Sequence, residues 1–173
     1  DPNDDDLPDG LDFGGREYRV MTYKDGNLPT TNTAWPNYIE VESETGDLVN
    51  DAAYKRNREV EERLDVTIVC NELPDFEVVK AVQQSVMAQD DTFDMAVFYS
   101  GPQMLGLIQD GMLLDVNTTE YIDLTKPYYS KDMVDTYRFG EKNYIFAGKY
   151  PYPQFASVYL LFNKELFENY KLD

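Results

Sequence analysis

Histidine is absent from this sequence, and cysteine occurs only once. Without histidine, the chain lacks the commonest general base, the commonest metal ligand and the Ser-His or Cys-His pairs that activate nucleophiles. The single Cys70 cannot form a disulfide within the chain, and its place in the apolar run VTIVC predicts a buried structural thiol. We therefore expect a protein that is not an enzyme and that holds neither a cofactor nor a metal.

Basic residues are few, and long hydrophobic runs are missing. The chain has 15 Lys and Arg against 33 Asp and Glu, which gives a formal net charge of −18. Such a charge repels the phosphate backbone of nucleic acids and anionic membrane surfaces. No stretch approaches the roughly 18 apolar residues of a membrane span, and the first residues, DPNDDDLPDG, lack the features of a signal peptide. The sequence also lacks Walker, GxGxxG, CxxC and calcium-loop motifs.

Hydrophobic residues make up 42% of the chain, and their spacing predicts strands and helices in alternation. Runs rich in β-branched and aromatic residues predict strands at 17–23, 65–72 and 93–99. The second run is almost continuously apolar, which is typical of a strand covered on both faces. A further short strand is expected at 38–42, and a hairpin is expected around Gly140.

Helix-start and helix-stop residues separate these strands. Asp47 is expected to cap a first helix, Pro74-Asp75 to start a second, and Pro102 to begin a third that ends at Gly111. The first helix carries apolar residues at helical spacing, namely Val49, Ala53, Val60 and Leu64. The β-α-β-α-β-α order predicts an α/β fold, with a mainly parallel sheet and flanking helices. Residues 1–15, which are acidic and punctuated by Pro and Gly, predict a flexible tether before this lobe.

In an open α/β sheet, ligands bind where the carboxyl ends of the strands meet loops and helix starts. The tetrapeptide Tyr99-Ser100-Gly101-Pro102 stands at such a junction. A ring with a polar tip, a hydroxyl, a close backbone approach and free helix amides suit a neutral polyhydroxylated ligand. The same residues are also ordinary helix-start chemistry, with Ser100 as a cap, and Tyr99 equally suits simple packing.

Four stretches make the chain similar to a known family: GDLVNDAAYKRNREVEERLDVTI (46–68), FDMAVFYSGPQMLGLIQDGMLLDV (93–116), KNYIFAGKYPYP (142–153) and SVYLLFNKELFENYKLD (157–173). The chain resembles the extracellular solute-binding proteins (family 1) of ABC importers, which have the type II periplasmic-binding-protein fold, and in particular lipoproteins of Gram-positive bacteria. The resemblance implies a first lobe over 16–150, and a hinge crossover with the start of a second lobe over 151–173. It further implies that the chain is truncated there.

The resemblance implies the function and the site together. It implies a protein that captures a solute, with a carbohydrate or oligosaccharide expected, in a cleft between two lobes and delivers it to the permease subunits of the transporter. Carried over by position, the expected ligand-binding residues are Tyr23, Lys24, Asp25, Tyr99, Ser100, Gly101 and Tyr152. It also implies an extracellular or periplasmic location, with a lipid anchor before Asp1 as the only membrane attachment.

Three other functions remain open on the sequence alone. The acidic balance also suits a receptor for peptides, polyamines or other cations, with Asp25 and Glu72 as the carboxylates that would converge on the ligand. A carboxylate-pair glycosidase is conceivable because acids are plentiful, although no pair stands out from the surface acids. A surface module that has kept the fold and lost its ligand is the third.

Overall fold

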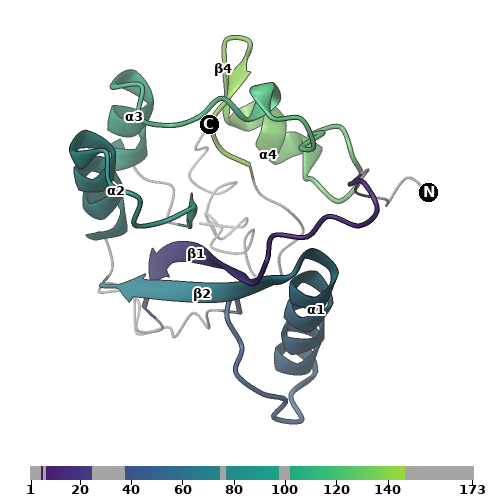
Figure 1. The fold of residues 1–173 in the computed structure, drawn as a ribbon. Coiled ribbons are helices and arrows are strands. Elements are labelled where there is room, and N and C mark those ends of the chain that lie inside the picture. Colours follow the sequence, from purple (N-terminus) through teal and green to yellow (C-terminus); the bar gives the residue numbers. More distant parts are fainter. Residues whose placement is uncertain (1–4, 6, 25–37, 75–76, 98–101, 147–173) are drawn as a thin grey trace, which may run out of the picture.

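The computed structural model describes residues 5, 7–24, 38–74, 77–97 and 102–146 (Figure 1). In these ranges the elements follow the order β1 (Arg16–Tyr23), α1 (Leu48–Leu64), β2 (Val66–Leu73), α2 (Glu77–Ala88), β3 (Met95–Ala96), α3 (Pro102–Gln109), η1 (Val116–Thr118), α4 (Lys131–Thr136), β4 (Arg138–Phe139) and β5 (Lys142–Asn143). The predicted alternation of strands and helices is therefore confirmed as far as α3.

The main sheet of the described residues has three parallel strands in the order β2-β1-β3. β1 and β2 pair along their whole lengths, from Arg16 opposite Val66 to Tyr23 opposite Leu73. The α/β fold with a parallel sheet is thus confirmed. The expectation that 65–72 is covered on both faces is wrong, because β2 is an outer strand of this sheet and its residues are half-buried or exposed.

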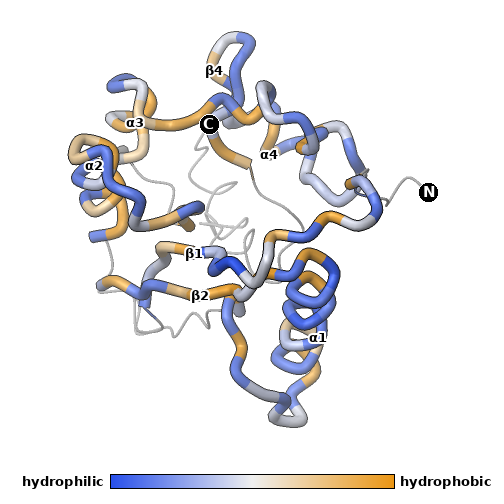
Figure 2. Tube along the Cα trace, viewed as in Figure 1, coloured by the Kyte–Doolittle hydropathy of each residue, from blue (hydrophilic) through white to orange (hydrophobic). Residues whose placement is uncertain are grey.

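Helix α1 covers one face of the sheet, and the side of the helix that is buried is largely polar. The predicted cap is confirmed, since the Asp47 carboxylate accepts from the amides of Val49 and Asn50 at 3.0 and 2.9 Å. The buried residues of the helix are Ala53, Asn57 and Glu61, whereas the predicted apolar residue Val60 is exposed. Figure 2 accordingly shows α1 as largely hydrophilic.

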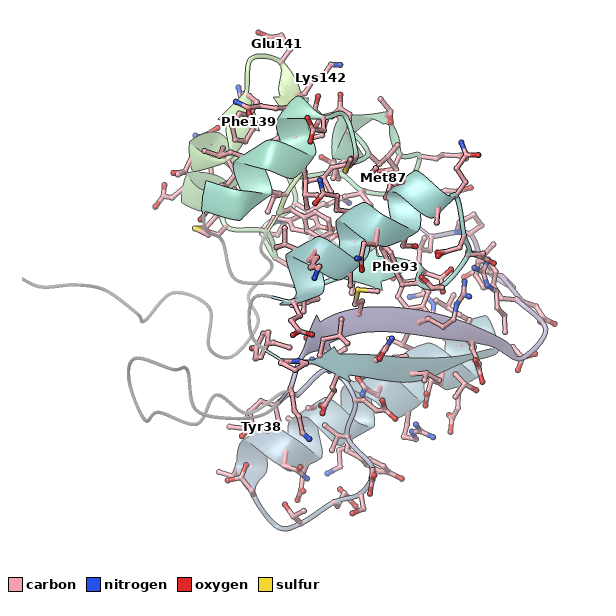
Figure 3. The ribbon with its side chains drawn as sticks, turned by 90° about the vertical axis from the view of Figure 1, so that its left-hand side faces the viewer. Tyr38, Met87, Phe93, Phe139, Glu141 and Lys142 are labelled. Carbon is pink, nitrogen blue, oxygen red and sulfur yellow. The ribbon has the colours of Figure 1, made fainter. Side chains whose placement is uncertain are left out.

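Helices α2 and α3 cover the other face and enclose the apolar core (Figure 1). Met21 of β1, Val78 and Val82 of α2, and Leu107 of α3 are each at most 4% exposed and contact one another. Phe93 packs against this cluster, and Figure 3 shows it between α2 and the sheet. The free energy gained by burying apolar surface is therefore concentrated on this face.

The ends of α2 and α3 have the same backbone geometry. Each helix is followed by a residue in the left-handed region, Gln89 with φ 54° and Gly111 with φ 66°. In α3 the amide of Gly111 donates to Ile108 O and that of Met112 donates to Leu107 O, at 3.1 and 2.9 Å. This pair of bonds is a Schellman motif, and it confirms Gly111 as the helix stop.

Residues 38–41 do not form the short strand predicted for 38–42. Their backbone carbonyls bond side chains of α1 instead: Arg56 Nη2 donates to Tyr38 O and Asn57 Nδ2 donates to Ile39 O, both at 2.6 Å. Val41 is buried. We call residues 38–41 the strap, because this segment is fastened to α1 rather than paired in a sheet.

The chain after α3 forms a small polar unit around Asn143. β4 and β5 pair antiparallel, with Phe139 opposite Lys142, so the predicted hairpin is confirmed, and Gly140 in its turn has φ 64°. Asn143, only 3% exposed, donates from Nδ2 to Val134 O at 2.9 Å, and its amide donates to Asp115 Oδ1 at 3.2 Å. These bonds join α4 and the segment before η1 to the hairpin.

The segment before β1 bonds the end of α1. Phe13 N donates to Leu64 O at 2.9 Å and Gly15 N donates to Asp65 O at 2.8 Å. The division into a tether, a lobe and a hinge stays a prediction, and the expected hinge region, 151–173, lies outside the described residues. Over the ranges that the structure describes, none of the helices has the length and apolar character needed to cross a membrane.

Candidate functional site

The carboxyl ends of β1, β2 and β3 meet at one edge of the sheet, as parallel pairing requires. Lys24 continues β1 by donating its amide to Leu73 O at 2.7 Å. Val97 continues β3 by donating its amide to Met21 O at 2.8 Å. Helix α2 begins shortly after β2. This edge is where an open parallel sheet binds ligands.

Of the residues predicted to bind a ligand, Tyr23 and Lys24 are described, and both lie at this edge. The half-buried Tyr23 packs on the apolar cluster of Met21, Val78, Val82 and Leu107. Lys24 is exposed. Tyr23 offers an aromatic ring supported by the cluster, and Lys24, the next residue of the chain, offers an exposed ammonium group. The other predicted residues, Asp25, Tyr99, Ser100, Gly101 and Tyr152, lie outside the described residues.

Asp94 holds β3 in place at the opposite end of the strands. Its carboxylate accepts from Arg19 N at 2.9 Å and from Arg19 Nε at 3.1 Å, and its own amide donates to Arg19 O at 2.9 Å. Arg16 pairs with the same carboxylate. The hydrogen bonds from Arg19 hold the pKa of Asp94 below its usual range, against the opposing effect of burial. We call these contacts of Asp94 with Arg19 and Arg16 the brace. The brace fixes the register of β3 and so brings Val97 to the carboxyl edge of the sheet, which we call the ligand edge.

Thr22, next to Tyr23, was not anticipated from the sequence. It is fully buried, and among the described residues its Oγ1 has no hydrogen-bond partner. A buried hydroxyl without a partner costs free energy, so it is an unusual side chain to find one position from a predicted binding residue. The only sequence signal for it is the alternation of β1, which puts Val20 and Thr22 on the same face.

Glu72 and Cys70 lie near the end of β2. Burial, reinforced by the negative charges of Glu40 and Glu72, raises the pKa of the Cys70 thiol to about 12. The thiol is therefore protonated at neutral pH, although Cys70 is half-buried rather than buried as predicted. Asp25, the second carboxylate of the alternative cation site, lies outside the described residues.

An aromatic cluster forms in the chain after η1. Tyr128 and Tyr129 have ring centroids 4.9 Å apart, and Phe146 meets Tyr129 edge-on at 5.5 Å. Burial raises the pKa of Tyr129, helped by Tyr128 and by the charge of Asp123. The cluster joins the loop before α4 to Phe146, the last residue of the range 102–146.

Comparisons with known proteins do not place the chain in a family. No protein-family model matches it, and a search of curated proteins found no match. Among the described residues there is also no group of three or more Cys, Asp or Glu side chains arranged to hold a metal ion. The groups described at the ligand edge, a phenol, an ammonium and a carboxylate, can form hydrogen bonds, stack and pair with charges.

Proposed function

We propose that this chain is the substrate-capture component of an ABC importer and binds a carbohydrate at the carboxyl edge of its parallel sheet. The observation that carries the proposal is Tyr23, a half-buried residue that lies at this edge and packs against the apolar cluster. Aromatic rings stack on the apolar faces of sugars, and their polar tips remain available for hydrogen bonds. The sequence resemblance to family 1 solute-binding proteins supplies the transport role.

The proposed mechanism is capture without chemistry. A ligand that contacts two lobes stabilises the closed arrangement by its differential affinity for that state. On this proposal the β2-β1-β3 lobe provides one half of the contact surface. The protein works outside the membrane, and the permease subunits are its partners.

The test is a ligand panel on the protein at the length its gene encodes, measured by thermal shift and calorimetry. We expect an oligosaccharide to raise the melting temperature and to bind with a measurable heat. Tyr23→Ala should abolish the response, whereas Tyr18→Ala should keep it, because Tyr18 lies in the same strand toward its other end and is partly exposed.

Three results would decide against the proposal or its site. A response to peptides or polyamines with none to any sugar would replace the carbohydrate by the cation or peptide class. Turnover of chromogenic glycosides would replace binding by catalysis. Equal loss of binding in the Tyr23 and Tyr18 variants would remove Tyr23 from the site.

A further inference from the structure

Strand β3 pairs with β1 over a much shorter length than β2 does. β1 and β2 pair through eight residues each, whereas β3 contributes only the two residues Met95–Ala96. One further bond precedes this pairing, in which Asp94 N donates to Arg19 O at 2.9 Å. Another follows it, in which Val97 N donates to Met21 O at 2.8 Å. Backbone pairing this short holds a strand only weakly, so β3 depends on side chains for its place.

The guanidinium group of Arg19 provides this support by bonding two acids of the connection between α2 and β3. Its Nε donates to Asp94 Oδ2 at 3.1 Å, and its Nη2 donates to Asp91 Oδ1 at 2.9 Å. Its Nη1 donates to the backbone carbonyl of Asp91. A planar guanidinium has donors in a fixed fork and makes these bonds together, whereas an ammonium group is a single point charge. The side chains of Arg19 and Asp94 are 25% and 12% exposed, so solvent screens their contact less than it screens a surface ion pair.

The same connection is tied to α2 by a separate set of bonds. Asp90 N donates to Ser85 O at 3.3 Å, and Thr92 Oγ1 donates to Asp90 Oδ1 at 3.0 Å. The hydroxyl oxygens of Ser85 and Thr92 are 2.9 Å apart. These bonds do not involve β1. If the contacts of Arg19 break, the turn therefore keeps its place on α2, while β3 can separate from β1.

We propose that β3 opens as a unit of its own while the β1-β2 pair stays intact, and that Arg19 is the positioning residue that keeps β3 closed. Opening costs the contacts that Phe93 and Ala96 make with the apolar cluster, but the four buried members of that cluster lie in β1, α2 and α3. Val97 stands at the ligand edge, so the closed population of β3 sets the fraction of molecules in which this part of the edge is formed. The link to ligand capture rests on the proposed function, whereas the opening of β3 can be measured without a ligand.

Native-state hydrogen exchange tests the proposal on the protein at the length its gene encodes, with single amides resolved by mass spectrometry. The amides of Asp94 and Val97 report the contact between β3 and β1. The amide of Val20 reports the β1-β2 pair, because alternate amides of β1, such as that of Lys24, point to β2. In the parent, we expect exchange at Asp94 and Val97 to depend little on urea, since a local opening exposes little surface. Exchange at Val20 should follow global unfolding.

Arg19→Lys is the main variant, because it keeps the positive charge and loses the fork of donors. It should speed exchange at Asp94 and Val97 by about tenfold. Exchange at Val20 should change only as far as the global stability, measured by urea unfolding, changes. Arg138→Lys is the matched control, because Arg138 forms an ion pair in the chain after η1 and its side chain is 47% exposed. This control should leave all three amides as in the parent.

Equal urea dependence at Val20, Asp94 and Val97 in the parent would overturn the proposal, because β3 would then open only when the whole fold unfolds. An Arg19→Lys variant in which the amides at β3 are unchanged, or in which all three amides speed up alike, would overturn it as well. If that variant does not fold, Asp94→Asn removes the same charged contact from the other side and is read in the same way. A ligand panel without any response would leave an opening of β3 standing, and a β3 that does not open would leave the capture function standing.

Discussion

At the residue scale, the left-handed positions show where this sequence carries backbone strain. Asp65 and Gln89 have positive φ values of 47° and 54° without being glycine. Asp65 follows α1 and donates its amide to Glu61 O, so it closes the helix with a single bond. Asp visits this region more easily than other residues with a Cβ, whereas Gln has no side-chain compensation there.

We expect Gln89→Gly to raise the free energy of unfolding by about 0.5–1 kcal/mol. Gln89 N donates to Val86 O and Asp90 N donates to Ser85 O, so the Schellman bonds are kept while the strain at residue 89 is relieved. Urea unfolding followed by circular dichroism measures the change.

The reverse substitution is the control for this change. Gly111 has the same conformation after α3, and a Cβ built there meets nothing within 4 Å, so Gly111→Gln should cost only the conformational strain. We expect a loss of about 1 kcal/mol. If Gln89→Gly instead lowered the free energy of unfolding, the Gln89 side chain would stabilise the fold by more than the left-handed backbone at residue 89 destabilises it.

We expect Asp94→Asn to lower the free energy of unfolding at neutral pH by about 1–3 kcal/mol, because it removes a charged acceptor from Arg19. The pKa of Asp94 is lower in the folded state than its ordinary value of 3.8. Its contribution is therefore complete above pH 3.8 and is lost as the pH falls through the lower folded value. The difference between parent and variant should shrink below pH 3.8.

Asp91→Asn is the matched control, because Asp91 also pairs with Arg19 but its side chain is 89% exposed. We expect this variant to follow the parent closely at every pH, since exposed ion pairs contribute little. Urea titrations from neutral to acid pH make the comparison. An Asp94→Asn effect that does not change with pH would assign the loss to packing rather than to charge.

At the element scale, locally coded features were predictable and features set by distant residues were not. Asp47 and Gly111 were assigned correctly because a cap or a left-handed stop acts within one turn of its helix. The strap was expected to be a strand because its sequence, YIEV, suits one. Arg56 and Asn57, far along the chain, take its carbonyls instead, and local sequence does not encode that competition.

Helix α1 shows a second way in which the pattern misleads. Its apolar residues suggested a buried stripe that includes Val60, but its buried stripe is Ala53, Asn57 and Glu61. Asn57 and Glu61 are buried because they satisfy backbone groups, namely the carbonyl of Ile39 and the amide of Ile68. A hydrophobicity pattern cannot detect a helix face that is chosen for hydrogen bonding.

Helix α3 provides a test of where the core lies. Leu107 is 2% exposed and belongs to the apolar cluster, whereas Leu105 of the same helix is 43% exposed. We expect Leu107→Ala to reduce the free energy of unfolding by about 2–5 kcal/mol, because it leaves a cavity between α2, α3 and the sheet. Leu105→Ala should cost less than about 1 kcal/mol. Chemical unfolding at one pH measures both, and similar losses in the two variants would contradict the assignment of the core.

At the scale of the whole molecule, part of the candidate site could be predicted because parallel topology determines it. Once strands 17–23, 65–72 and 93–99 are recognised and expected to be parallel, their carboxyl ends must meet at one edge. The position of Tyr23 and Lys24 at this edge follows from that rule. Thr22 does not, because the lack of a partner for a buried hydroxyl depends on the three-dimensional packing around it.

The net charge leads to the last prediction. With 33 acids against 15 bases, the folded chain holds like charges closer together than the unfolded chain does, so repulsion opposes folding. Salt at about 0.5 M shortens the screening length to a few ångströms and weakens this repulsion. We expect the free energy of unfolding to increase from low to high sodium chloride.

The ion pairs around Arg19 and Asp94 act in the opposite direction, because salt weakens them too. These ion pairs are few, and solvent already screens them in part. The repulsion between the excess negative charges should therefore decide how stability changes with salt. Urea unfolding in sodium chloride measures the sum of the two effects, and Asp94→Asn, which lacks the half-buried charged partner of Arg19, should gain more from salt than the parent. A parent stability that falls with salt would mean that the brace outweighs the net charge.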